Sequence, residues 1–325
     1  MLITVSVIIP VLNGVPFIAR AVRSALNQTG VQVEVLVADN GSTDGTWSIL
    51  EGLAAADRRV RPLDASAQRG AGFARNAGLD AATGDWIAVL DADDVMYPTR
   101  LERLIAFAEQ RRAGVVADNQ RLVDMRGKFL RLAWSPKAFP HSIDAAGFIT
   151  SNLNAWRSMD FGFLKPVFRR EVISASGMRY PSHIRVGEDS HFLYLLLKSG
   201  QLLHLCRDAY YIYYQTPGSL CRSWTEPDLH ALLLNNQAEL DSLTGDETNL
   251  RTALINQRLS IAVQLTHYAF IDAVKNCRLD HAMALLVDCP PVIPRIIHYG
   301  RRSVVKRLAG LRHAGHVTGA GAGVA

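Results

Sequence analysis

The sequence has few cysteines and no closely spaced cysteine pair. Its 325 residues contain four cysteines, and none of them forms a C-x-x-C pair. Disulfide frameworks belong to oxidising compartments, whereas scattered single cysteines are typical of proteins from reducing ones. The sequence therefore predicts free thiols in a cytoplasmic protein. The four positions are Cys206, Cys221, Cys277 and Cys289.

Long apolar runs are also missing. A membrane-spanning helix needs about 18 consecutive apolar residues, and the nearest approach, Leu259 to Ile271, is too short. Met1 to Val5 leads directly into an expected strand, so we expect no secretory signal there. The chain is 49% hydrophobic and 20% charged, which describes a globular protein with one large domain or two.

Acidic residues are missing from the last part of the chain. None follows Asp288, whereas six cations do, and the net charge of the whole chain is +5. Apolar residues alternate with these cations, which predicts a basic amphipathic helix over Pro294–Arg312 that lies on an anionic membrane surface. The alternative is a helix packed on residues 250–288 with its cations in water. No nucleic-acid partner is expected, because aromatic residues are not interleaved with the cations. The cations are Arg295, Arg301, Arg302, Lys306, Arg307 and Arg312.

Strands and helices are expected to alternate through the first third of the chain. A repeat of about 25–30 residues is typical of βαβ units, so we predict an α/β fold with a mostly parallel central sheet flanked by helices. Residues 122–132 suggest a charged hairpin, and residues 227–289 are helical throughout. The expected strands are 5–10, 33–39, 60–63, 86–90, 115–118, 164–168 and 202–214, and the expected helices 16–27, 47–56, 73–84, 101–112 and 188–199.

The stretch from Trp86 to Asp94 places three carboxylates directly after an apolar run. A buried strand ending there would deliver acids to the carboxyl edge of a sheet, where open α/β folds bind ligands. In an extended backbone, residues i and i+2 project to the same side, so Asp91 and Asp93 would converge on one object. Such a pair needs a cation or a network of hydrogen-bond donors between its charges. A divalent cation is the simpler interpretation, because Mg²⁺ or Mn²⁺ takes one or two carboxylates plus phosphate oxygens and water. The alternative is a solvated acidic turn before a helix that starts near Pro98.

Two further side chains are expected near the same edge. Asp39 ends the second strand, where it would accept a hydrogen bond from a ring N–H such as that of uracil, or form an Asx-turn or helix N-cap. Arg75 follows a Gly-x-Gly opening and would pair with phosphate, with a neighbouring carboxylate, or in a surface ion pair. Because position 75 is Arg and these glycines follow the third strand, the dinucleotide fingerprint is missing. This argues against a nicotinamide dehydrogenase.

Four motifs stand in a specific order along the chain. They are P-V-L-N-G from residue 10, A-D-N-G-S-T-D-G-T from residue 38, R-G-A-G-F-A-R-N-A-G from residue 69 and L-D-A-D-D from residue 90. In this order they resemble the family 2 glycosyltransferases, which have the GT-A nucleotide-sugar fold. The resemblance is close over residues 4–100 and patchy from there to Gly187. It implies transfer of a sugar from a nucleotide donor, with inversion at the anomeric carbon.

The resemblance also implies a role for each matching residue. Asp39 is the implied base-reading acid, Asp91 the acid near ribose and metal, and Asp93 the metal ligand. In the family's E-D motif, here Glu188 and Asp189, the second acid is the implied general base. Further implied donor contacts are Pro10, Asn13, Asp44, Arg75 and Ala92.

The reaction's chemistry agrees with these roles. An inverting transfer needs a carboxylate that takes the acceptor hydroxyl's proton, and positive charge at the departing diphosphate. The positive end of a helix dipole would favour a carboxylate at Asp189. The alternative is that Glu188 and Asp189 are ordinary first-turn acids of a helix.

Two weaker features follow the expected strand 202–214. Aromatic side chains there would either stack on acceptor sugars or belong to the core, and residues 217–220 resemble the family's flexible segment over the donor diphosphate. The Q-x-x-R-W motif of processive members is missing, which argues against a polymer-extruding synthase. The aromatic residues are Tyr210, Tyr211, Tyr213, Tyr214 and Trp224.

We expect a GT-A domain over residues 1–225, with a nucleotide-sugar half to residue 115 and an acceptor half from 116. A helical extension over 226–318 and a disordered tail over 319–325 would follow. The expected protein is a cytoplasmic, metal-dependent, inverting hexosyltransferase at the inner face of the membrane. It would move glucose from UDP-glucose to a polyprenyl-linked exopolysaccharide unit.

Two rival functions remain at this stage. A sugar-1-phosphate nucleotidyltransferase would need a basic loop after the first strand, and residues 11–15 contain no basic residue. An inactive carbohydrate-binding or assembly-scaffold protein would have no need of a general base, so the acid at position 189 argues against it.

Overall fold

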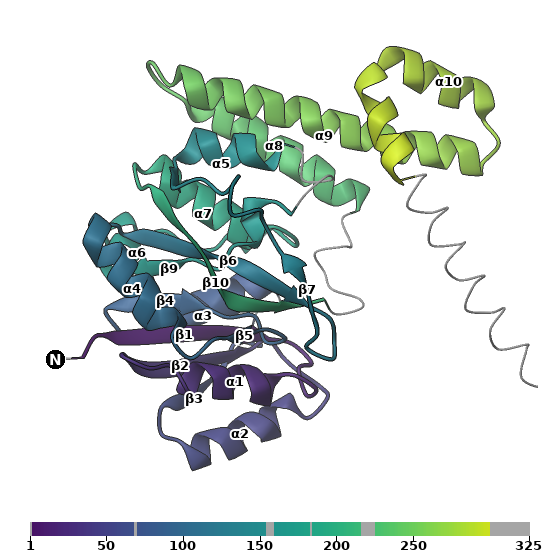
Figure 1. Ribbon diagram of the computed structural model, residues 1–325. Coiled ribbons are helices and arrows are strands. Elements are labelled where there is room, and N and C mark those ends of the chain that lie inside the picture. The colour runs from purple at the N-terminus through teal and green to yellow at the C-terminus, as the bar shows by residue number, and fades with distance from the viewer. Residues whose placement is uncertain (1, 68–69, 154–158, 183, 216–224, 300–325) are drawn as a thin grey trace, which may run out of the picture.

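The computed structural model describes residues 2–67, 70–153, 159–182, 184–215 and 225–299. A ten-stranded sheet runs through the molecule, and helices cover both of its faces (Figure 1). The strands are β1 Thr4–Val11, β2 Gln32–Asp39, β3 Val60–Asp64, β4 Trp86–Val89, β5 Val95–Met96, β6 Val115–Val123, β7 Phe129–Leu132, β8 Ser142–Ile143, β9 Val167–Arg169 and β10 Leu203–Tyr214.

The helices follow the expected alternation in the first third and dominate the last third of the described chain. They are α1 Ile18–Leu26, α2 Thr46–Ala56, α3 Ala71–Ala81, α4 Arg100–Arg111, α5 Ala145–Asn152, α6 Arg170–Ser176, α7 Glu188–Lys198, α8 Glu226–Ser242, α9 Thr248–Lys275 and α10 Leu279–Asp288, with the 3-10 turns η1 Phe161–Phe163 and η3 Pro290–Val292.

The sheet is parallel in its first half and mixed in its second. The strand order is β3-β2-β1-β4-β9-β6-β10-β5, with β7 on β6 and β8 on β10. Strands β3, β2, β1 and β4 are parallel, as predicted, and β6 is parallel to β10. Strand β9 is antiparallel to both of its neighbours. The carboxyl ends of β1, β2 and β4 therefore meet at one edge.

Alternating side chains of the central strands pack into two separate hydrophobic cores, one on each face of the sheet. On β1, Val7 and Ile9 pack with α1, α2 and α4, whereas Ile8 packs on the other face with α3, α5 and α7. All three side chains are fully buried. Burying such a side chain contributes about 1.5–3 kcal/mol, so these runs hold the sheet edge in place.

Several element boundaries differ from those expected. Helix α1 begins at Ile18 rather than at residue 16, because the chain first makes a turn in which Phe17 donates a backbone hydrogen bond to Gly14. The strand expected over 164–168 is the shorter β9. The sequence did not predict β5, β8, α5 or α6, whose lengths are too short for a clear periodicity. The charged hairpin is confirmed as β6 paired with β7.

The C-terminal part of the described chain is helical, as predicted, in three separate helices. Helix α9 packs against α5 and α8, and α10 lies at the far end from the sheet (Figure 1). Residues 293–299 are also helical. Across the described ranges, no helix is long and apolar enough to cross a membrane.

Candidate active site

The ends of β1 and β2 form a loop pair that we call the nucleotide corner, after Pro10, Asn13, Asp39 and Asp44. Pro10 is the register partner of Ala38, next to Asp39. Asn13 has a left-handed backbone with φ 53°, and its Oδ1 accepts a hydrogen bond from the Thr43 amide at 2.8 Å. This hydrogen bond joins the two loops that are predicted to bind the donor.

The two acids of the nucleotide corner are held by neutral donors. The Oδ1 atom of Asp39 accepts from the Ser42 amide at 3.1 Å and from the Ser42 hydroxyl at 2.5 Å, which fixes the turn after β2. Asp44 accepts from the Thr46 hydroxyl at 2.6 Å and from the Val15 amide at 3.1 Å. Led by the Thr46 hydroxyl, these bonds lower the pKa of Asp44.

The acidic motif after β4 forms a turn rather than an extended segment. The Asp94 amide donates to the Asp91 carbonyl at 3.1 Å, which closes the turn over residues 91–94. The expectation that Asp91 and Asp93 project to one side of an extended strand is therefore wrong. A turn satisfies the backbone where β4 leaves the sheet. Ala92 is half-buried in this turn and packs against the core.

The third acid of the motif points inward. Asp94 is 1% exposed and accepts from the Tyr211 hydroxyl at 2.8 Å and from the Tyr214 amide at 2.9 Å. Burial raises the pKa of Asp94 well above its ordinary value, and the neighbouring acids Asp93 and Asp91 add to the effect. The Tyr211 hydroxyl in turn accepts from the Asp91 amide at 3.2 Å. Tyr211 is thus a core residue that fixes the turn.

Arg75 lies inside the protein and pairs with carboxylates, so the surface ion-pair alternative is wrong. Its side chain is 6% exposed, and its guanidinium pairs with Glu188 and, at 3.2 Å, with Asp91. The Oδ2 atom of Asp189 is 4.0 Å away. Although burial disfavours the cation, these three acids raise the pKa of Arg75 above its ordinary value.

Lys165 is a site residue that the sequence analysis did not find. It precedes β9, its side chain is 5% exposed, and its Nζ lies 2.9 Å from Asp91 and 2.8 Å from Asp189. Burial opposes its charge, but the two acids raise the pKa of Lys165 well above its ordinary value. The available signal was a lone lysine within the apolar run 163–168. We call Arg75, Lys165, Asp91, Glu188 and Asp189 the ionic cluster.

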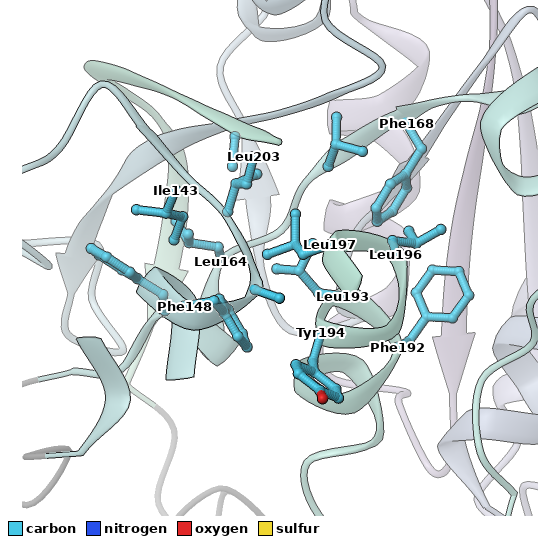
Figure 2. Close-up of a cluster of buried hydrophobic side chains, with 14 of the residues drawn as sticks. Ile143, Phe148, Leu164, Phe168, Phe192, Leu193, Tyr194, Leu196, Leu197 and Leu203 are labelled. Atoms are coloured by element: carbon cyan, nitrogen blue, oxygen red, sulfur yellow. The ribbon is translucent and has the colours of Figure 1, made fainter. Parts of the chain in front are cut away.

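Helix α7 carries both acids of the predicted E-D motif in its first turn. Gly187 precedes it with φ 91°, a left-handed conformation that suits glycine. The helix is anchored by buried side chains that pack against α5 and its neighbours (Figure 2). The first turn is therefore fixed relative to the sheet. The buried side chains of α7 are Phe192, Leu193, Tyr194, Leu196 and Leu197.

The two acids of α7 have different partners. Glu188 is 7% exposed, and burial raises its pKa although Arg75 opposes the shift. Asp189 accepts from the Ser190 amide at 2.9 Å with Oδ1 and from Lys165 at 2.8 Å with Oδ2. Both acids therefore belong to an ion-pair network, which ordinary exposed first-turn acids do not form.

A second acid beside Asp189 was also missed. Burial and the charge of Asp189 raise the pKa of Asp160 to about 6, although the Gly162 amide donates to its carboxylate. The loop approaches α7 so closely that a Cβ at Gly162 would lie 2.6 Å from the Ser190 hydroxyl. A glycine is therefore required there.

The donor set at the acidic turn fits a hard divalent cation only together with ligands from a substrate. Within the described ranges, no group of three or more His, Cys, Asp or Glu side chains is placed to hold a metal ion. The Asp91 carboxylate already contacts Lys165 and Arg75, and Asp93 follows it in the turn. One or two carboxylates plus diphosphate oxygens and water are the usual shell of Mg²⁺ or Mn²⁺.

The remaining predicted features are divided between core, surface and undescribed residues. Arg20 stacks on the Tyr214 ring with its guanidinium carbon 3.6 Å from the ring centroid, and donates to the Asp93 carbonyl at 2.7 Å. Trp224 and the segment 217–220 lie outside the described residues.

The basic stretch from residue 294 is described only to residue 299. Arg295, the first of its cations, is 7% exposed and lies over the Tyr299 ring. This cation is therefore not in water. Residues 300–312 lie outside the described ranges.

The comparisons with known proteins agree with this geometry. Residues 6–176 match the family described as "Glycosyl transferase family 2". The chain is 36% identical over 237 residues to the succinoglycan biosynthesis protein ExoO of Rhizobium meliloti, which covers 73% of this chain and 68% of ExoO. It is 29% identical over 302 residues to ExoU of the same organism, covering 90% of this chain and 85% of ExoU.

Solved structures share the fold at low sequence identity. The crystal structure of S. aureus TarS 1-349 in complex with UDP-GlcNAc has a TM-score of 0.63 and 18% identity, covering 91% of this chain and 92% of that one. The mannosyltransferase PcManGT from Pyrobaculum calidifontis, in complex with GDP-Man and Mn²⁺, has a TM-score of 0.60 and 19% identity. It covers 92% of this chain and 80% of that one. With the matched family over more than half of its length, this chain belongs to the family 2 glycosyltransferases and is a glycosyltransferase of the exopolysaccharide type.

Proposed function

We propose that this glycosyltransferase moves a hexose, glucose in the first instance, from a UDP-sugar to a hydroxyl of a lipid-linked glycan, with inversion. One observation carries the proposal. The ionic cluster joins Asp91, at the donor edge of the sheet, to Asp189, at the start of a buried helix, through one lysine ammonium. One lysine thus contacts both the carboxylate that would serve the donor and the carboxylate that would serve the acceptor.

The steps that this chain's residues perform follow from their positions. Asp39 would accept the uracil N3–H, because it ends β2 and has a second carboxylate oxygen besides the one bound to Ser42. Asp189 would take the proton of the acceptor hydroxyl as that oxygen attacks the anomeric carbon from the face opposite the nucleotide. Arg75 would hold Asp91 and Glu188 in place through its guanidinium.

Asp93 and the diphosphate would hold a Mg²⁺ or Mn²⁺ ion, with Asp91 beside them. When bound, such an ion supplies a Lewis acid to the departing diphosphate. The Mn²⁺ complex of the archaeal mannosyltransferase supports this assignment by analogy.

A uridine donor is supported by the UDP-GlcNAc complex of TarS, and a glycan acceptor by the likeness to two succinoglycan biosynthesis proteins. Glucose is the donor sugar to be tested first. The test is a release assay with UDP-, GDP- and dTDP-sugars plus Mn²⁺ or Mg²⁺, in which slow hydrolysis without acceptor identifies the donor. If UDP-glucose is the one donor of the panel that is hydrolysed, the proposed donor is supported. Turnover of a non-uridine donor, or the α-configured product by NMR, would contradict it.

To act on a membrane-linked acceptor, the enzyme would have to reach the membrane surface from the cytoplasmic side. The support is the run of cations at 301–312 without any acid. Each such cation contributes on the order of 1 kcal/mol at an anionic surface. Co-sedimentation with anionic liposomes at low and high salt compares the full chain with one ending at Pro291. Equal sedimentation of the two forms would exclude attachment through this stretch.

The division of the chain belongs to the same proposal. Residues 1–225 would form the catalytic domain, with its acceptor half from residue 116, and 226–318 the helical extension. The tail 319–325, expected to be disordered, lies outside the described residues. Expression of residues 1–225 alone tests the boundary. The proposed division predicts that this fragment folds and still binds UDP.

A further inference from the structure

Lys165 is the one member of the ionic cluster that contacts both a donor-side and an acceptor-side acid within 3 Å. Its backbone is fixed as well as its side chain. The Lys165 carbonyl accepts from the Arg100 guanidinium at 2.5 Å, and Arg100 pairs with Asp118 at 2.8 Å. Both of those side chains are at most 1% exposed. The buried Arg100–Asp118 pair therefore fixes the backbone from which the Lys165 ammonium extends.

A buried lysine needs such partners, because removing a charge from water costs several kcal/mol unless it is paired. Two aspartates compensate the charge here. The same ammonium must then separate Asp189 from its other neighbouring cation, since the Arg75 Nη2 lies 4.0 Å from the Asp189 Oδ2. Without Lys165, this carboxylate would move onto the guanidinium, whose fork favours two parallel hydrogen bonds.

The hydrogen bonds of Asp189 leave its carboxylate able to accept a hydrogen bond from a substrate hydroxyl. Each of its oxygens receives one donor, the Ser190 amide on Oδ1 and Lys165 on Oδ2. A carboxylate has about four lone-pair sites, so each oxygen keeps one for a substrate hydroxyl. A carboxylate bound bidentately to Arg75 would have both oxygens occupied by the guanidinium.

We propose that Lys165 is a positioning residue that holds the Asp189 carboxylate toward Asp91 and the donor, and keeps it from pairing with Arg75. The inference rests on the proposed function, because it takes Asp189 as the base. It assigns to Lys165 an effect on turnover and none on nucleotide binding.

The test compares Lys165→Met and Lys165→Ala with wild type in UDP release from UDP-glucose, with Mn²⁺ and water as acceptor. Lys165→Met should lower kcat at least about 10²-fold, as loss of a positioned base does, with KM unchanged. Ethylamine should restore part of the kcat of Lys165→Ala in a saturable way, because its cation fits the vacated space. Lys198→Met is the matched control, since Lys198 pairs with Glu239 outside the cluster.

Each outcome decides the inference. A higher KM with unchanged kcat would assign Lys165 to donor binding and overturn it, as would unchanged kinetics. If Lys165→Met does not fold, the response of Lys165→Ala to ethylamine decides, and no rescue overturns the inference. Failure of the proposed function looks different, because wild type would then release no UDP, or Asp189→Asn would remain active.

Discussion

The nucleotide corner and the ionic cluster lie along one edge of the same sheet but are built in opposite ways. In the nucleotide corner, Asp39 and Asp44 accept hydrogen bonds from hydroxyls and amides. In the ionic cluster, Arg75 and Lys165 are at most 6% exposed and bind three carboxylates. A ligand donor can replace one of these partners singly, since each hydrogen bond to a carboxylate contributes about 1.5–3 kcal/mol and the replacing bond contributes as much.

The ionic cluster cannot change so easily. Breaking a buried ion pair by removing one partner costs about 3–5 kcal/mol. A fixed network of this kind aims charge at the reacting atoms before the substrate arrives, which is the usual source of electrostatic catalysis. We therefore propose that donor binding and turnover depend on different parts of the edge, so that substitutions can separate them.

The largest effect is expected for Asp189→Asn in the ionic cluster. The amide keeps the shape and the Ser190 hydrogen bond but cannot take a proton, so turnover should fall about 10²–10⁴-fold. Affinity for UDP, measured by calorimetry, should stay the same. Retention of most activity would move the base role to Glu188 or elsewhere.

Asp93→Ala should remove metal-dependent UDP binding while leaving the fold intact, because Asp93 lies in a turn and not in the core. Calorimetric titration of UDP with and without Mn²⁺ measures this. Asp124→Ala, in the turn before β7, is a control of similar kind. If Asp93→Ala bound UDP as tightly as wild type with the same metal dependence, Asp93 would not be the ligand.

Asp39→Asn should weaken donor binding and spare turnover at saturating donor. Loss of one hydrogen bond to a charged acceptor is worth about 1.5–3 kcal/mol, or roughly a 10- to 100-fold rise in donor KM. Asp64→Asn is a matched control, because Asp64 ends the neighbouring β3 opposite Asp39 and accepts from Ser66 in the same way. An equal rise in KM for both variants would show a general effect on the loops.

The smallest effect concerns the pH dependence of stability. The pKa of Asp160 is raised from 3.8 to about 6 in the folded chain. The folded state therefore binds more protons between these values, and Asp160 makes stability fall as pH rises through this window. The melting temperature of Asp160→Asn should lie a few degrees above that of wild type at pH 7–8. At pH 3.5 the two melting temperatures should be equal. Melting curves with the same difference at both pH values would contradict the assignment.

Local sequence patterns were sufficient for the first third of the fold. Each apolar run there is followed by a helix with a clear period, from β1 to α4. The patterns predicted a strand near β9 but not its place in the sheet, because its three residues pair with β4 and β6, which are distant in sequence. Short helices such as α5 offered too few turns for a period to be seen.

For the site, acids at strand and helix ends could be found, but their directions could not. Asp91 and Asp93 follow a strand as predicted, yet they lie in a turn over 91–94 and not in an extended segment. Lys165 and Asp160 come from the weakly patterned middle of the chain, and only the tertiary structure brings them to Asp189. The choice for Arg75 between phosphate and carboxylate likewise depended on where α7 would lie.

The most direct test of the division between the two regions is one set of donor saturation curves. UDP release from UDP-glucose with Mn²⁺ is measured for wild type, Asp39→Asn and Asp189→Asn on the same day. The account predicts that Asp39→Asn raises KM and keeps kcat, and that Asp189→Asn lowers kcat and keeps KM. If both substitutions changed the same constant, binding and turnover would not be divided between the nucleotide corner and the ionic cluster.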